Sequence, residues 1–157
     1  MKRLSLLILA LCLPLTAHAY KVGDSVEPAV LSKIGAAAGK VSVVDFFAEW
    51  CASCRKELPL ISAIQPQLNP QKVEVIGVDV SEDPVLAQAF QQALRAKKHL
   101  EFRVVNDAEQ QLVSKFRPLG FPALYFIKDG KVVGKHIGAQ SDVDALIVRE
   151  LSALGAV

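Results

Sequence analysis

Hydrophobic and polar positions along the chain fall into two kinds of segment from about residue 40 onward. Two runs, 40–47 ("KVSVVDFF") and 72–80 ("KVEVIGVDV"), are nearly all apolar and rich in β-branched residues. Such runs are typical of strands buried on both faces, as in the middle of a parallel sheet. The shorter run 101–105 ("EFRVV") predicts a third strand.

Between and after these runs, apolar residues recur at helical spacing. They predict four helices, at about 52–68, 84–98, 108–116 and 142–154. Pro59 lies inside the first helix and is expected to kink it. Pro84 is expected to open the second, with Asp83 as its N-cap.

The last two predicted strands form a hairpin. The segments 123–128 ("ALYFIK") and 131–138 ("KVVGKHIG") are joined by Asp129-Gly130, a dipeptide typical of tight hairpin turns. Strands that alternate with helices and end in a hairpin predict an α/β fold with a mixed sheet. Residues 20–39 are expected to be irregular, and the absence of repeats predicts one domain over 20–157.

The amino-terminal pattern is typical of an export signal. Lys2 and Arg3 precede an apolar run, Leu4 to Leu15, and Ala17-His18-Ala19 provides a small-residue cleavage site. We therefore expect residues 1–19 to be a signal peptide cleaved after Ala19. The alternative is an uncleaved membrane anchor, although the apolar run is shorter than the about 20 residues that span a bilayer.

The charge of the chain changes when this segment is removed. Of its 18 basic residues, Lys2 and Arg3 lie in the signal, which leaves 16 against 16 acidic residues. A chain with no net charge offers no electrostatic attraction to nucleic acid or to an anionic membrane. Neither is expected as a partner.

The cysteines point to redox chemistry. Of three in the chain, Cys12 lies in the signal, so the exported protein carries only Cys51 and Cys54. A disulfide across four residues closes almost no loop and would stabilise the fold little. At the first turn of a helix, unpaired N–H groups and the helix dipole favour a thiolate on Cys51. Cys54 lies on the same helical face and can attack a mixed disulfide formed there.

A metal site and a separate cofactor are not expected. A structural zinc ion needs about four ligands, and the chain has neither a second Cys-x-x-Cys pair nor a pair of neighbouring histidines. The cysteine pair itself can carry the electrons.

Several residues near the cysteines have two interpretations at this point. Asp45 lies in the apolar run and is either a buried acid with a raised pKa that moves protons, or a solvated residue at a wet strand end. Pro122 by itself would mark the start of a strand, and Trp50 would be a half-buried aromatic residue. Glu49, Arg55 and Lys56 are either ordinary exposed charges at the helix start or charges that adjust the pKa of Cys51.

Two longer motifs resemble the thioredoxin superfamily. "VDFFAEWCASC" is similar to the thioredoxin strand and active site, and "PLGFPALYFIKDGKVVGKHIGA" to its cis-proline loop and terminal hairpin. The resemblance implies a thioredoxin-like fold with a mixed central sheet flanked by helices. It assigns the buried acid to Asp45, the tryptophan before the nucleophile to Trp50, and the cis-proline and its preceding residue to Pro122 and Phe121.

Departures from plain thioredoxin narrow the resemblance. The stretch 79–122 accommodates an inserted helix and strand, which resembles the TlpA/ResA/DsbE branch of exported proteins. That branch implies a monomeric periplasmic thiol-disulfide oxidoreductase that reduces protein disulfides, such as apocytochrome c cysteines before haem attachment. Its electrons would come from a membrane donor of the DsbD or CcdA type. Ala52-Ser53 replaces Gly-Pro, and Gly77 lies nearest the position of the thioredoxin lysine.

The resemblance also implies roles. Cys51 attacks the substrate disulfide, Cys54 resolves the mixed disulfide and Asp45 assists proton transfer. Trp50, Phe121 and Pro122 bind the substrate. Alternative functions are a disulfide oxidase or isomerase, a thiol peroxidase, and a module in which the cysteines bind Cu(I).

Overall fold

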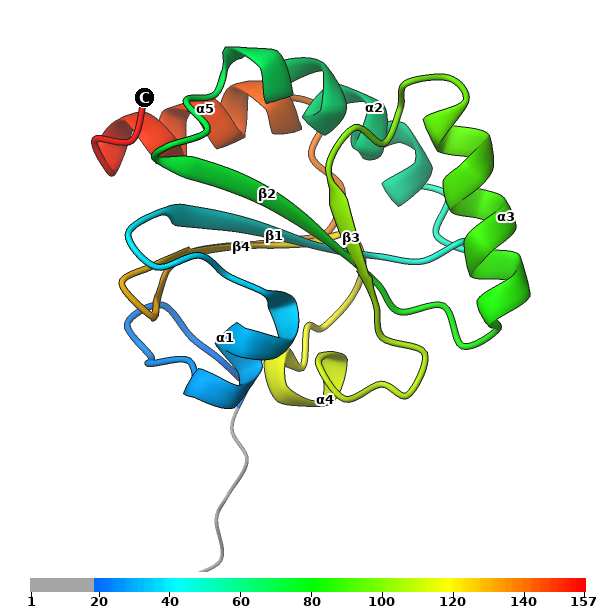
Figure 1. Cartoon of the computed structure of the whole chain (residues 1–157), viewed down its shortest axis with the longest axis horizontal. Coiled ribbons are helices and arrows are strands. Elements are labelled where there is room, and N and C mark those ends of the chain that lie inside the picture. Colours follow the sequence, from blue (N-terminus) through cyan, green and yellow to red (C-terminus); the bar gives the residue numbers. More distant parts are fainter. Residues whose placement is uncertain (1–18) are drawn as a thin grey trace, which may run out of the picture.

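The computed structural model describes residues 19–157 and forms a five-stranded sheet with helices on both faces (Figure 1). The predicted signal peptide and Cys12 lie outside the described residues, except for Ala19. In chain order the elements are α1 (Pro28–Ile34), β1 (Val41–Phe47), α2 (Cys54–Ile64), the 3-10 turn η1 (Gln65–Gln67), β2 (Val73–Asp79), α3 (Pro84–Arg95), β3 (Arg103–Asn106), α4 (Val113–Phe116), β4 (Ala123–Lys128), β5 (Lys131–Ile137) and α5 (Val143–Ala153).

The sheet is mixed and is centred on β1, as predicted. The strand order is β3-β2-β1-β4-β5, in which β1 is parallel to β2 and antiparallel to β4. All seven residues of β1 are buried, which explains its apolar, β-branched sequence. Asp45 lies in the middle of β1, opposite Gly77 on β2 and Leu124 on β4.

Two aromatic clusters join the sheet to its helical layers. On the face covered by α1 and α4, the Phe46 ring packs 4.8 Å from the Phe116 ring, which lies 4.9 Å from that of Tyr20. On the face covered by α2, α3 and α5, the Phe47 ring lies 6.1 Å from that of Phe90 in α3. Alternate residues of β1 therefore supply the core of both layers.

The local signals for α3 and for the hairpin are confirmed. The Asp83 carboxylate caps α3 by accepting hydrogen bonds from the backbone N–H groups of Val85 and Leu86, at 2.8 and 3.2 Å. Asp129 and Gly130 have φ angles of 51° and 72°, the left-handed pair that a tight hairpin turn requires. The inserted helix and strand are α3 and β3.

The prediction that residues 20–39 are irregular is wrong, because they contain α1. Pro28 opens this helix and Gly35, at φ 68°, ends it. The seven-residue helix is too short for a clear apolar period, and a distant residue holds it. The Arg103 guanidinium of β3 donates to the carbonyl oxygens of Ile34 and Gly35, at 2.8 and 2.9 Å.

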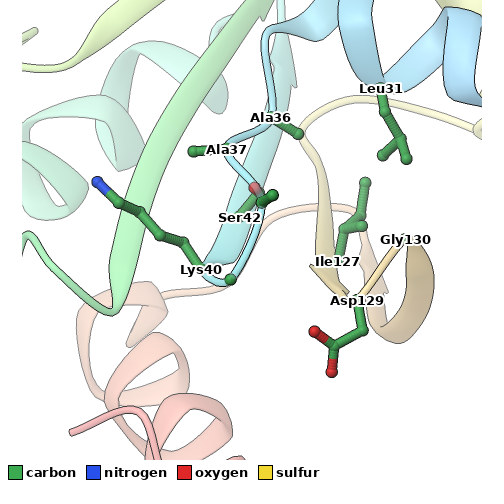
Figure 2. A pocket seen from close by; sticks show the side chains of 10 residues that line it. Leu31, Ala36, Ala37, Lys40, Ser42, Ile127, Asp129 and Gly130 are labelled. Carbon is green, nitrogen blue, oxygen red and sulfur yellow. The ribbon is translucent and has the colours of Figure 1, made fainter.

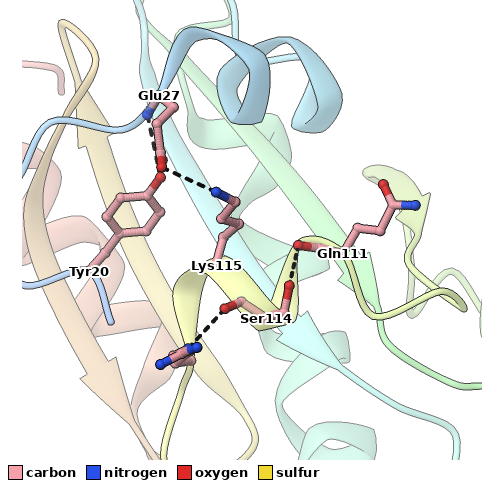
Figure 3. Close-up of polar contacts among 6 residues, drawn as sticks. Tyr20, Glu27, Gln111, Ser114 and Lys115 are labelled. Atoms are coloured by element: carbon pink, nitrogen blue, oxygen red, sulfur yellow. Dashed lines mark hydrogen bonds and ion pairs between the residues drawn. The ribbon is translucent and has the colours of Figure 1, made fainter. Parts of the chain in front are cut away.

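The same leading segment is also tied to α4, as Figure 3 shows. The Glu27 N–H donates to the Tyr20 hydroxyl at 3.4 Å, and the Glu27 carboxylate pairs with the Lys115 ammonium at 3.4 Å. Tyr20 is only 6% exposed, so the segment is part of the packed domain.

Two predicted helices begin later than expected. The helix predicted at 108–116 is limited to Val113–Phe116, because the buried Asp107 carboxylate accepts the N–H groups of Leu112 and Val113 and organises a turn before it. The first predicted helix begins at Cys54 rather than at residue 52, with Pro59 inside it. Within residues 19–157, no helix combines the length and apolarity needed to cross a bilayer.

The close packing at Gly77 gives a test of the sheet. A Cβ at this position would lie 2.7 Å from Cε1 of Phe47, so Gly77→Ala must displace a buried ring. We expect it to destabilise the protein by about 1–3 kcal/mol, measured by urea unfolding. Gly120→Ala is the matched control, because nothing lies within 4 Å of its Cβ position. Equal stability of both variants would contradict this account of the packing.

Candidate active site

Cys51 and Cys54 form a disulfide at the carboxyl end of β1. Their Cα atoms are 5.3 Å apart, and Cys54 is the first residue of α2. Cys51 is 5% exposed, whereas Cys54 is completely buried. Both cysteines are thus buried, and Cys51 is the less buried of the two.

Backbone groups around Cys51 favour its thiolate form. The Cys54 N–H lies 3.2 Å from Sγ of Cys51, and the Arg55 N–H donates to the Cys51 carbonyl oxygen at 3.2 Å. Once the disulfide is reduced, the Cys54 N–H points at the Cys51 sulfur from the amino end of α2. This placement stabilises negative charge on that sulfur.

Asp45 is a buried acid, and the alternative of a solvated strand end is wrong. Its residue is 1% exposed, and neither carboxylate oxygen has a hydrogen-bond partner among the described residues. Burial away from water raises the pKa of Asp45 well above its usual value, and the nearby Glu57 carboxylate raises it further. No cation lies opposite it on β2, where the residue is Gly77.

Glu57 is a site residue that the sequence analysis did not single out. It lies on α2 and is 5% exposed. Burial raises the pKa of Glu57, while a hydrogen bond from the Gln140 N–H lowers it in part. Its position three residues after Cys54 places it on the same helical face, a spacing that could have revealed it. Asp45 and Glu57 thus form an interacting pair of buried acids, one on β1 and one on α2.

Trp50 and Phe121 form an aromatic contact beside the disulfide. Their ring centroids are 5.6 Å apart in an edge-to-face arrangement. Trp50 is 62% exposed, so the expectation of a half-buried aromatic residue is wrong. The Phe121–Pro122 peptide is cis, as the resemblance implies, and the buried Pro122 accepts a hydrogen bond from the Gly138 N–H at 2.9 Å. Leu119, in the same loop, is 95% exposed.

A groove of about 460 Å³ lies next to the cysteines, between α2 and the loop that follows β5. Ser53, which separates the cysteines, lines it together with Lys56 and Glu57 of α2 and with Gln140 and Ser141 of the loop. Glu57 therefore connects the acid pair to an open surface.

A second cavity, of about 240 Å³, lies at the opposite end of β1 (Figure 2). Lys40 and Ser42 line it at the start of this strand, together with Asp129 and Gly130 of the hairpin turn. Figure 2 shows the Lys40 and Asp129 side chains pointing away from each other, so the polar groups do not converge. The strand separates this cavity from the disulfide by roughly 20 Å, at about 3.3 Å per residue. It is not part of the candidate site.

The described residues contain no group of three or more His, Cys, Asp or Glu side chains placed to hold a metal ion. His136 instead pairs with Glu150, at 2.8 Å between Nε2 and Oε1.

Comparisons with known proteins agree with this geometry. Residues 16–136 match the model of the AhpC/TSA family. The thiol-disulfide oxidoreductase ResA of Bacillus cereus is 31% identical over 105 residues, which cover 66% of this chain and 58% of that protein. The chain thus spans less than two thirds of the length of the curated relatives it matches.

Solved structures give the same fold. A Chlorobium tepidum protein assigned as the thiol:disulfide interchange protein DsbE superposes with a TM-score of 0.71 at 23% identity, covering 86% of this chain and 98% of that one. A secreted disulfide oxidoreductase of Mycobacterium tuberculosis, homologous to DsbE of E. coli, has a TM-score of 0.60 at 26% identity and covers 74% and 83% of the two chains. The fold is therefore thioredoxin-like.

The raised pKa of Asp45 predicts a pH dependence of stability. The folded protein binds the Asp45 proton more tightly than the unfolded chain, so stability falls as pH rises from the unfolded pKa of about 3.9 towards the raised folded pKa. For each pH unit between the unfolded and the folded pKa, the free energy of unfolding falls by about 1.4 kcal/mol. In Asp45→Asn this fall should be smaller than in the wild type, as measured by urea unfolding of the disulfide form between about pH 4 and 8. The part that remains comes from Glu57, whose pKa is also raised by burial.

The matched control is Asp129→Asn, because Asp129 is exposed and asparagine also tolerates its left-handed backbone. This control should keep the wild-type pH profile. A wild-type profile in Asp45→Asn as well would show that burial of Asp45 does not disfavour its charge.

Proposed function

The chain belongs to the AhpC/TSA family of thioredoxin-like proteins, and from this membership we propose that it is a thiol-disulfide oxidoreductase that reduces protein disulfides. The observation that carries the proposal is the Cys51–Cys54 disulfide at the amino end of α2, in a site that also contains the buried acids Asp45 and Glu57. A purely structural disulfide has no need of a thiolate-stabilising N–H or of a pair of buried acids.

The proposed reaction starts from the reduced pair, which holds the two electrons to be transferred. The Cys51 thiolate attacks one sulfur of the substrate disulfide, forms a mixed disulfide and releases the first substrate thiolate, which takes up a proton. The Cys54 thiol loses its proton, and its sulfur then attacks Sγ of Cys51. The second substrate thiolate leaves and is protonated, and the Cys51–Cys54 disulfide remains.

The acid pair would accept the Cys54 proton. The charges of Asp45 and Glu57 interact, and Glu57 lies three residues after Cys54 on α2. A carboxylate with a raised pKa is a stronger base than an exposed one, so it suits proton transfer near neutral pH. Glu57, at the edge of the groove, would pass the proton to solvent.

The substrate would bind across the aromatic contact. Trp50 and Phe121 present an apolar surface beside Cys51, and the Phe121 backbone would pair with an extended substrate segment. Pro122 would hold this backbone in position. The preferred substrate is therefore a disulfide in an unfolded or extended polypeptide.

The cellular setting is also part of the proposal. Residues 1–19 would export the protein to the periplasm and be cleaved after Ala19, and the protein would act as a monomer. The supporting observations are the signal-like sequence and the similarity to a ResA protein. Apocytochrome c cysteines would be a substrate, and a membrane protein of the DsbD or CcdA type would return electrons to the cysteine pair.

Cysteine variants test the two-step reaction. Cys51→Ser should abolish reduction of insulin disulfides, because no thiolate is left to attack. Cys54→Ser should instead accumulate mixed disulfides with substrate, which can be trapped with acid and detected on non-reducing gels. Undiminished insulin reduction by Cys51→Ser would refute the assignment of the nucleophile.

The reduction potential of the pair tests the direction of electron flow. We expect a value at or below about −220 mV, as in glutaredoxin- and thioredoxin-like couples. It can be measured by equilibration with glutathione and alkylation of the free thiols. A value near about −120 mV would instead indicate a disulfide oxidase.

A further inference from the structure

The main chain just before Cys51 is held by side chains from two other parts of the fold. Ala48, Glu49 and Trp50 link the end of β1 to the disulfide and are not in a helix or strand. A segment of this kind needs side-chain contacts to keep one conformation. Glu49 receives these contacts on both its N–H and its carbonyl oxygen.

The Arg55 side chain, from α2, binds the carbonyl group before Trp50, while the Arg55 backbone binds the carbonyl of Cys51. Its Nη2 donates to the Glu49 carbonyl oxygen at 2.5 Å, and its own N–H donates to the Cys51 carbonyl oxygen at 3.2 Å. The guanidinium also lies over the Phe90 ring of α3, 4.4 Å from the ring centroid. The ring face limits the movement of the planar group and favours its positive charge.

Ser81 holds the other side of Glu49. Its hydroxyl accepts a hydrogen bond from the Glu49 N–H at 3.0 Å and donates to the Asp79 carboxylate at 2.5 Å. Asp79 and Ser81 are each 1% exposed, and the second oxygen of Asp79 accepts from the Gln91 amide at 2.7 Å. This anchor is therefore buried and fully hydrogen-bonded, unlike Asp45.

We propose that Arg55 is a positioning residue for the reaction: with Phe90 behind it and Ser81 on the opposite side, it fixes the Glu49–Trp50 main chain and so aims Cys51 and the Trp50 ring at the substrate. The effect of Arg55 on kcat/KM rests on the proposed function, whereas its effect on the Glu49–Trp50 main chain does not. From the sequence, Arg55 is expected to be an ordinary exposed charge, with adjustment of the Cys51 pKa as the alternative. The structure assigns the guanidinium to a backbone carbonyl and an aromatic ring instead.

Lysine is the discriminating substitution. Arg55→Lys keeps the positive charge, but its single ammonium lacks the planar fork that binds a carbonyl while stacking on a ring. If Arg55 acts by position, Arg55→Lys and Arg55→Met should both lower kcat/KM for a disulfide peptide by about fivefold. If it acts by charge, Arg55→Lys should retain the wild-type value, and the proposal falls.

The matched control is Arg103, whose guanidinium also binds backbone carbonyls but holds α1, away from the cysteines. Arg103→Lys and Arg103→Met should lower stability and leave kcat/KM unchanged. If Arg55→Met likewise lowers only stability, Arg55 has a structural role alone and the proposal is overturned.

Two readouts remain valid even if the protein does not reduce disulfides. Trp50 is the only tryptophan in the chain, so its fluorescence anisotropy decay reports the motion of this segment alone. A fast local component should grow in both Arg55 variants and in Ser81→Ala, but not in the Arg103 variants. The rate of Cys51 alkylation in the reduced protein should change in the same variants. Unchanged anisotropy in Arg55→Met would overturn the proposal, whereas an inactive wild type with altered anisotropy would refute only the proposed function.

Discussion

The complete burial of β1 is the constraint on which the rest of the structure depends. Every residue of this strand packs into the core, so both of its neighbours must be strands and both of its faces must be covered by helices. At the carboxyl end of β1, the chain leaves the core and continues into α2. The disulfide lies at this point, between a rigid strand and the amino end of α2.

Because β1 is buried, the Asp45–Glu57 pair lowers the stability of the fold. Asp45 takes the place of an apolar residue, has no hydrogen-bond partner among the described residues and lies close to a second carboxyl group. By contrast, Asp79 is equally buried but satisfied by Ser81 and Gln91. One buried carboxylate therefore holds structure in place, while the other keeps a raised pKa that stability alone would not favour.

Features with a local cause could be predicted from sequence. The buried strands, the Asp83 cap and the hairpin turn each depend on residues within a few positions of one another. Features that depend on distant contacts could not. Helix α1 is held by Arg103, far along the chain. The spacing of Glu57 from Cys54 is visible in the sequence, but its interactions with Asp45 and with the Gln140 N–H come from the fold. In the site, the cysteines, the acid and the cis-proline were found from their motifs, whereas the contacts of Arg55 required coordinates.

The docking of the leading segment has a mechanical consequence. Residues 23–26 pair with the outer side of β5 through backbone hydrogen bonds, among them Gly23 N–H to Val132 O and Val26 N–H to Gly130 O, each at 2.8 Å. A force applied at Tyr20 would act at once on these bonds to β5, at the edge of the sheet, and on the packing of the Tyr20 ring against Phe116. Both attachments would have to break before the leading segment could be pulled away from the sheet.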